Sequence, residues 1–212
     1  MNAPSPAGRT RQRRKSARPQ ELLQAALELF VEKGLANTRA EDVAARAGVS
    51  KGTLYLYFTS KDDLFMSVVR HHLTDVIMEG EDILARHTGS AGELLNTLAL
   101  TWWQRVTASR AAGLLVVMMA EAKQFPELAL FYVNEVIVPS RALAAKAIQY
   151  GIDRGEFRTL DVDTAVLSLM STLQFLLVYH EITSICVNDP GAMAPEVYLP
   201  QQIEMLLQGM MK

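Results

Sequence analysis

Several signals for helix starts lie close together in one short stretch of this chain. Thr38 and Glu41 have the spacing of a capping box, in which the hydroxyl accepts a hydrogen bond from a backbone N–H and the glutamate reaches back to the cap. Ser50 is placed to cap a second short helix, and Ser60 opens a third, longer one. Gly48 separates the first two helices, where a reversal of the chain needs a left-handed residue. We therefore expect short helices joined by tight turns in this stretch.

Outside this stretch the apolar residues recur at helical spacing, and we find no convincing strand alternation. Leu22 to Val31 form one helical stripe, which Pro19 opens and Gly34 ends. The periodicity predicts further helices over residues 61–85, 91–109, 112–124, 126–152, 161–186 and 196–210. Pro139 should kink or split the fourth of these. The predicted fold class is therefore all-α.

Charge is distributed unevenly along the chain. Residues 1–61 contain 11 Lys and Arg against 5 Asp and Glu, a net of +6, whereas residues 62–212 contain 10 against 18, a net of −8. Basic residues crowd residues 9–18, where no hydrophobic face is available for burial. We expect residues 1–18 to form a disordered basic arm that meets a polyanion. A solvated basic tail is the simpler alternative.

The composition excludes other classes of protein. Hydrophobic residues make up 50% of the chain and charged residues 21%, which is typical of globular proteins. The longest uninterrupted apolar run, from Leu114 to Ala120, is far shorter than the roughly 18 residues that span a bilayer. The basic N-terminus is not followed by the apolar segment of a secretory signal. We expect a cytoplasmic protein with no membrane partner.

The sequence offers no constellation for catalysis. His71 and His72 are adjacent, so they face different directions on a helix and cannot chelate a metal together. No zinc, phosphate-loop or nucleophile motif is present. We expect no metal, no cofactor and no enzymatic activity.

Residues 39–58 have the spacing of a helix-turn-helix. Ala44 is small where a second helix must cross, Gly48 permits the turn, and apolar residues stand where two helices would pack together. Recognition helices contact bases from their first turn, so we expect Lys51, Thr53 and Gly52 to approach base edges. The expected DNA-binding residues are Thr38, Ser50, Lys51, Gly52, Thr53, Tyr55, Tyr57 and Lys61. In the alternative interpretation, the aromatic residues of this set are core residues of a helical bundle.

A specific resemblance covers residues 19–66. It is carried by the run T-R-A-E-D-V-A-A-R-A-G-V-S-K-G-T-L-Y-L-Y-F-T-S-K-D-D-L-F, from Thr38 to Phe65, which resembles the signature of the tetracycline-repressor (TetR/AcrR) family. The resemblance implies a one-component regulator, usually a repressor, that is an all-α homodimer. Residues 19–66 would be its helix-turn-helix DNA-binding domain, and residues 67–212 its helical effector-binding and dimerisation domain. By the same resemblance, Lys51, Gly52, Thr53, Tyr55, Tyr57 and Lys61 match DNA-contacting positions, and Thr38 matches a phosphate contact.

Within residues 67–212, aromatic, methionine and polar side chains in apolar company could line an effector cavity. The candidates are Trp102, Arg105, Met118, Glu121, Phe125, Phe131, Gln174 and Tyr179. Residues 121–128 and 151–157 resemble a common C-terminal subtype of the family, which indicates the fold but not the ligand. The alternative for each aromatic or methionine is an ordinary place in the core.

The last two predicted helices carry apolar stripes that suit a dimer interface. The candidates are Leu169, Leu173, Leu176, Leu177, His180, Ile203, Leu206 and Leu207, with an intramolecular bundle face as the alternative. We therefore expect a repressor that binds palindromic double-stranded operator DNA as a homodimer and is released by a small, largely apolar effector of unknown identity. An activator with the same DNA chemistry and a non-specific architectural DNA binder remain alternatives. The helix that begins at Ser60 would act as the lever between the two domains.

Overall fold

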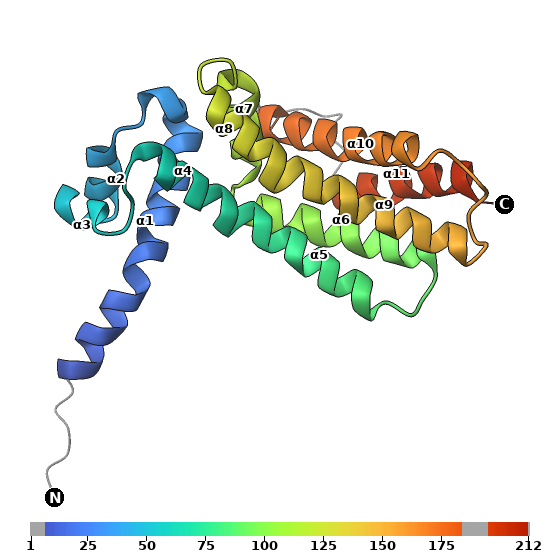
Figure 1. Cartoon of the computed structure of the whole chain (residues 1–212), viewed down its shortest axis with the longest axis horizontal. Coiled ribbons are helices and arrows are strands. Elements are labelled where there is room, and N and C mark those ends of the chain that lie inside the picture. Colours follow the sequence, from blue (N-terminus) through green and yellow to red (C-terminus); the bar gives the residue numbers. More distant parts are fainter. Residues whose placement is uncertain (1–6, 184–194, 212) are drawn as a thin grey trace, which may run out of the picture.

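The computed structural model describes residues 7–183 and 195–211, and for residues 7–18, 195 and 196 it describes the backbone alone. Helices make up almost all of this part of the chain, and its β-structure is limited to an isolated antiparallel bridge between Phe157 and Met211. Figure 1 shows a small N-terminal group of helices and a longer helical bundle, with one helix leading from the first into the second. The predicted all-α fold is confirmed.

The N-terminal group contains α1 (Ala7–Asn37), α2 (Ala40–Arg46), α3 (Lys51–Tyr55) and α4 (Lys61–Val69). Its core forms where apolar residues of the four helices meet. Phe30 of α1 is fully buried, and its ring meets that of Phe65 of α4 edge-on, with centroids 5.4 Å apart. Val43 of α2 and Leu54 of α3 are also completely buried, so the two short helices are held against α1 and α4.

The arm predicted to be disordered over residues 1–18 is helical from Ala7 onward, so that prediction is wrong for residues 7–18. Residues 1–6 lie outside the described part. Arginine, lysine and glutamine have high helix propensity, and Pro19 inside α1 removes a single backbone donor from an otherwise favourable sequence. The predicted end of this helix is confirmed, because Gly34 leaves helical geometry with φ +79°.

The predicted lever helix runs from Lys61 to Arg86, as α4, a π-helical turn η1 (Arg70–Thr74) and α5 (Asp75–Arg86). Its cap is the predicted one, since the Ser60 hydroxyl accepts a hydrogen bond from the Asp63 N–H at 3.0 Å. Asp63 in turn accepts from the Thr59 N–H at 2.7 Å. Reciprocal hydrogen bonds between Asp63 and residues 59 and 60 thus fix the N-terminus of the helix that joins the two parts of the molecule.

The bundle continues with α6 (Ala91–Ala108), α7 (Ala112–Glu121), α8 (Pro126–Tyr132), η2 (Val133–Ile137), α9 (Val138–Asp153), α10 (Val162–Thr183) and α11 (Pro195–Met210). Pro139 neither ends nor splits its helix. Instead, the π-helical turn η2 directly precedes it. Proline offers no N–H to the carbonyl of Glu135 and its ring crowds that carbonyl, and a wider π turn relieves both effects.

The two parts of the molecule share one hydrophobic core. α1 packs against α7, and α4 packs against α8. Buried residues of α1 and α4 belong to the same cluster as Trp103, Leu114 and Met118 of the bundle. The boundary that we predicted near residue 66 therefore falls inside α4, in the middle of continuous packing.

Candidate functional site

The second helix of the helix-turn-helix, α3, is short, and its N-terminus is capped by a side chain. The Ser50 hydroxyl accepts a hydrogen bond from the Thr53 N–H at 3.1 Å, as its predicted capping role requires. Leu54 is buried, while the residues around it face outward: Lys51, Gly52, Tyr55, Leu56 and Tyr57. Leu56 has 81% of its surface exposed. Leu56 is not among the expected DNA contacts, yet it lies on the same exposed surface as Lys51, Tyr55 and Tyr57.

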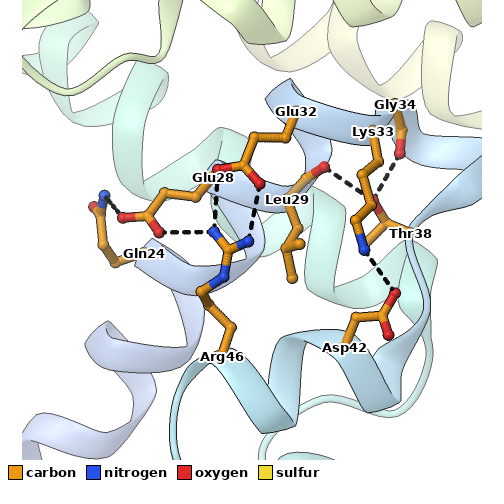
Figure 2. Close-up of polar contacts among 9 residues, drawn as sticks. All are labelled: Gln24, Glu28, Leu29, Glu32, Lys33, Gly34, Thr38, Asp42 and Arg46. Atoms are coloured by element: carbon orange, nitrogen blue, oxygen red, sulfur yellow. Dashed lines mark hydrogen bonds and ion pairs between the residues drawn. The ribbon is translucent and has the colours of Figure 1, made fainter.

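Polar contacts hold α2 against α1 beneath this surface (Figure 2). The guanidinium of Arg46 contacts Glu32 at 2.9 and 3.1 Å and Glu28 at 3.3 Å, and Lys33 pairs with Asp42 at 3.2 Å. The hydrogen bond from Arg46 lowers the pKa of Glu32. Because these pairs are partly exposed, each adds little stability, but the paired contact with Glu32 fixes the orientation of α2.

Thr38 does not face the surface. It is 1% exposed, and its hydroxyl donates towards the carbonyl of Gly34 at 2.7 Å and that of Leu29 at 3.1 Å (Figure 2). The residue before α2 is Arg39, which makes no side-chain cap. The predicted capping box and the predicted phosphate contact of the Thr38 side chain are therefore wrong. The hydroxyl instead satisfies carbonyls at the point where α1 breaks.

Lys61 makes contacts within the protein in addition to its expected role. Its ammonium donates to the carbonyls of Leu35 at 2.8 Å and Ala36 at 3.3 Å and lies 5.8 Å from the centre of the Phe125 ring. Two of its three donors are thus used within the protein. These contacts hold the α1–α2 junction, and the phosphate contact expected of Lys61 stays a prediction.

The bundle contains a cavity of about 130 Å³ that is partly open to solvent, and its walls come from α5 to α7, α9 and α10, η1 and η2, and the end of α8. Two of the predicted residues, Trp102 and Gln174, line it. Most of the lining is apolar, and its polar side chains include Thr101, Ser140 and Tyr132. Burial raises the pKa of Tyr132 to about 12, so its phenol stays protonated and remains a hydrogen-bond donor.

The other predicted cavity residues lie elsewhere. Arg105 pairs with Glu79 at 2.8 Å on the outside of the bundle. Met118 and Phe125 belong to the shared core, and Phe131 lies under the guanidinium of Arg70 at 4.8 Å. Tyr179 stacks on Phe175, with centroids 6.4 Å apart, and Glu121 points to α1. Helical spacing alone does not reveal which face of each helix turns to the cavity.

Residues that the sequence interpretation missed include Gly80 of α5 and Leu143 of α9, which meet across the cavity wall. A Cβ atom on Gly80 would lie 2.5 Å from Leu143 Cδ2. The cavity is also bordered by both π turns, through Leu73 of η1 and Val136 of η2. An isolated glycine inside a predicted helix, Gly80, was a signal in the sequence that could have pointed to this close crossing.

The face of α10 predicted for dimerisation is turned inward. Leu169, Leu176 and Leu177 are at most 8% exposed, and Ile203 of α11 is 2% exposed. Leu173 lines the cavity, His180 packs edge-on against Trp103 at 5.4 Å, and Leu206 and Leu207 are half-buried against the bundle core. The interface predictions for the buried residues are therefore wrong.

The outward face of α10 carries Leu167, Phe175 and Ile182, which are 62%, 71% and 59% exposed.

Among the described residues, two helices are long and apolar enough to cross a membrane by length and composition, Pro126–Asp153 and Val162–Thr183. In this structure both belong to the bundle, where α9 packs against α5, α6 and α10. Within residues 7–183 and 195–211, no group of three or more His, Cys, Asp or Glu side chains could hold a metal ion.

Comparison with known proteins gives consistent matches along the chain. Residues 22–68 match the family described as bacterial regulatory proteins, tetR family, and residues 93–208 match the AefR-like transcriptional repressor, C-terminal domain. The HTH-type transcriptional repressor KstR2 of Rhodococcus jostii (strain RHA1) is 28% identical over 198 residues, with 92% of each chain covered.

Solved structures have the same fold. The ketosteroid transcriptional regulator KstR2 of Mycobacterium tuberculosis is 26% identical, with a TM-score of 0.69 over 92% of this chain and 95% of that chain. The regulator FadR from Bacillus subtilis, solved in complex with stearoyl-CoA, has a TM-score of 0.71 at 22% identity and covers 90% of this chain and 98% of that chain.

Proposed function

The chain belongs to the TetR family of bacterial transcriptional regulators and is a ligand-responsive repressor, and from this premise we propose which part of the structure binds DNA, which binds the effector and which forms the dimer. α3 reads operator DNA, the bundle cavity receives the effector, and the outward face of α10 joins two copies. A repressor of this kind works on chromosomal DNA, so we expect it in the cytoplasm.

The exposed surface of α3 is the observation that carries the DNA-binding part of the proposal. Lys51 and Gly52 begin the helix and face solvent, and Tyr55 and Tyr57 are 44% and 37% exposed. A helix of this size enters the major groove with its first turn at the base edges, while tyrosine hydroxyls reach phosphates. Leu56 is added to the expected contacts, because an exposed apolar side chain there can contact a thymine methyl group.

The basic N-terminal part of α1 extends the same proposal. Figure 1 shows that this part of the helix projects away from the rest of the molecule. Its sequence contains Arg9, Arg11, Arg13, Arg14, Lys15 and Arg18. A helix with this charge density favours the phosphate backbone without regard to base sequence. We expect it to contribute affinity and salt dependence, with α3 supplying the preference for one site.

The cavity favours an apolar effector with few polar groups. Its volume of about 130 Å³ is below the roughly 300 Å³ at which ligand pockets usually begin. An effector of metabolite size must therefore push the walls apart, which couples its binding to movement of α5, α7 and α9. KstR2 is named a ketosteroid regulator and FadR was solved with stearoyl-CoA. We propose a related class here, an extended or polycyclic hydrocarbon skeleton of the kind carried as a thioester.

A homodimer explains the outward face of α10. Leu167, Phe175 and Ile182 recur at spacings that put them on one side of the helix, and each is more than half exposed in the single chain. Exposed apolar side chains in such a row mark a surface for association. Two-fold pairing through this face would present two α3 helices to a palindrome.

The test is a selection of binding sites from random DNA, followed by a mobility shift in excess non-specific competitor. We expect a palindromic site, and we expect stearoyl-CoA or a steroid thioester to release the protein from it. If no sequence is enriched, the proposal that α3 reads a specific palindromic operator is overturned. A palindrome without release by either compound would exclude the proposed effector class and leave the DNA-binding part intact.

A further inference from the structure

Two charged side chains from different helices hold the backbone where α1 joins α2. The carboxylate of Glu121, at the end of α7, accepts hydrogen bonds from the N–H groups of Leu35 at 3.1 Å and Ala36 at 2.8 Å. The ammonium of Lys61, at the start of α4, donates to the carbonyls of the same two residues. All four polar backbone groups of Leu35 and Ala36 are therefore bound by side chains of opposite charge. We call this arrangement the junction clamp.

The chain is shaped to admit the carboxylate. Gly34 has φ +79°, and a Cβ atom there would overlap Oε1 of Glu121. Glycine is thus required at this position both for its backbone conformation and for the close approach of Glu121. Successive N–H groups that point at one carboxylate form a site for a negative charge. The contact is consequently specific for an anionic side chain from α7.

α7 lies between the clamp and the cavity. Ala111, just before its first residue, and Leu115 line the cavity. On the side that meets α1, Gly113 packs so closely that a Cβ atom there would lie 2.6 Å from Val31 of α1. The same short helix thus touches the space that an effector would fill and, through Glu121, the backbone that leads into the helix-turn-helix.

We propose that Glu121 is a positioning residue for DNA reading: it holds the α1–α2 junction against α7 so that α3 keeps one orientation relative to the bundle. Displacement of α7 by an effector then moves the helix-turn-helix through this carboxylate. The inference rests on the proposed function, because orientation matters only if two α3 helices read one palindrome. The proposed role differs from simple stabilisation of the fold. A single helix-turn-helix can bind DNA without the junction clamp, whereas a pair that reads one palindrome needs the orientation that the clamp maintains.

Glu121→Gln tests the proposal, because the amide has nearly the same shape and retains only one acceptor oxygen. Glu127→Gln, at an exposed position on α8, is the matched control. The affinities of wild type and both variants are measured for the selected palindrome, for a half-site, and for palindromes with one to three base pairs inserted between half-sites. We expect Glu121→Gln to lower affinity for the natural spacing by about tenfold, within the usual range of coupling between sites. Half-site affinity should stay unchanged, and the preference among spacings should flatten.

A second measurement does not involve DNA. Amide hydrogen exchange at Leu35 and Ala36 should become at least about tenfold faster in Glu121→Gln and remain unchanged in Glu127→Gln, because the variant weakens the acceptor that protects these groups. Unchanged exchange would overturn the clamp. Equal loss on palindrome and half-site would also overturn the inference, because it would mean that Glu121 only stabilises the fold. A wild type that prefers no palindrome over a half-site would instead overturn the proposed function, and the inference with it.

Discussion

The ammonium of Lys51, at the first residue of α3, forms an ion pair with the carboxylate of Glu41 on α2. The hydrogen bond between them raises the pKa of Lys51 and lowers that of Glu41. Lys51 also lies 5.8 Å from the centre of the Tyr55 ring. In the free protein the leading cation of the recognition helix is therefore already paired, and DNA must compete with Glu41 for it.

Glu41→Gln should strengthen DNA binding. The substitution removes the competing carboxylate, so we expect affinity for random DNA to rise by about threefold at low salt, as suits the loss of one exposed ion pair. Fluorescence anisotropy with labelled duplexes measures it. Glu81→Gln, which removes the same charge from the pair with Lys146 on the bundle, is the control. Equal or weaker binding by Glu41→Gln would show that Glu41 does not compete with DNA.

Thr38→Val should destabilise the fold without removing a phosphate contact. The buried hydroxyl satisfies two carbonyls, so we expect a loss of about 1–2 kcal/mol in the free energy of unfolding. Urea denaturation measures this loss, with Thr97→Val, an exposed hydroxyl bonded to the carbonyl of Glu93, as control. The dependence of log affinity on log salt should keep its slope. A slope smaller by about one would restore Thr38 to the phosphate contacts.

Gly80→Ala should weaken binding of apolar ligands. The added methyl group meets Leu143 at the cavity wall and takes space from a small cavity. We expect the affinity for 8-anilinonaphthalene-1-sulfonate, followed by its fluorescence, to fall by at least about threefold. The reason is that a ligand in the smaller cavity buries less of its apolar surface. Gly209→Ala adds a methyl group with nothing within 4 Å and serves as control. Unchanged affinity in Gly80→Ala would place the probe outside this cavity.

His72 should make stability depend on pH. Burial, and then the neighbouring His71, lowers the pKa of His72 to about 4 from its ordinary value of 6.5, and its Nε2 is buried with no hydrogen-bond partner in the described part of the protein. The unfolded chain binds a proton at His72 below pH 6.5 while the folded chain does not, so stability is lost as pH falls from about 6.5 to about 4. Urea midpoints at pH 7.0 and 4.5 should therefore differ more for wild type than for His72→Gln. Equal differences would mean that His72 titrates normally in the folded protein.

Phe175→Asp should give a monomer. Phe175 is 71% exposed in the single chain, and a carboxylate at the centre of an apolar interface must be desolvated without a partner. Sedimentation velocity should show a dimer for wild type and a monomer for the variant, which should also lose the palindrome. Leu130→Asp, at a position of α8 that is 61% exposed, is the control. A dimeric Phe175→Asp variant would place the interface on another face.

The sequence by itself determined the local architecture. Helical periodicity, the caps at Ser50 and Ser60, and the stop at Gly34 depend on neighbouring residues, so the helices and the exposed α3 could be predicted without a structure. The sequence pattern was less informative where one side chain can form either of two sets of hydrogen bonds. Thr38 could cap α2 or turn inward, and only burial against the break in α1 decided between them.

Tertiary structure alone decided how the helices face one another. Glu121 follows an apolar run and looked like a cavity residue, but its partners lie 86 and 85 residues earlier in the chain. The apolar residues of α10 surround the helix, so its periodicity could not show that Leu176 faces the core and Phe175 faces outward. Periodicity specifies that a helix has faces. Packing against residues distant in sequence selects which face is buried, and that selection places the cavity, the outward face of α10 and the junction clamp.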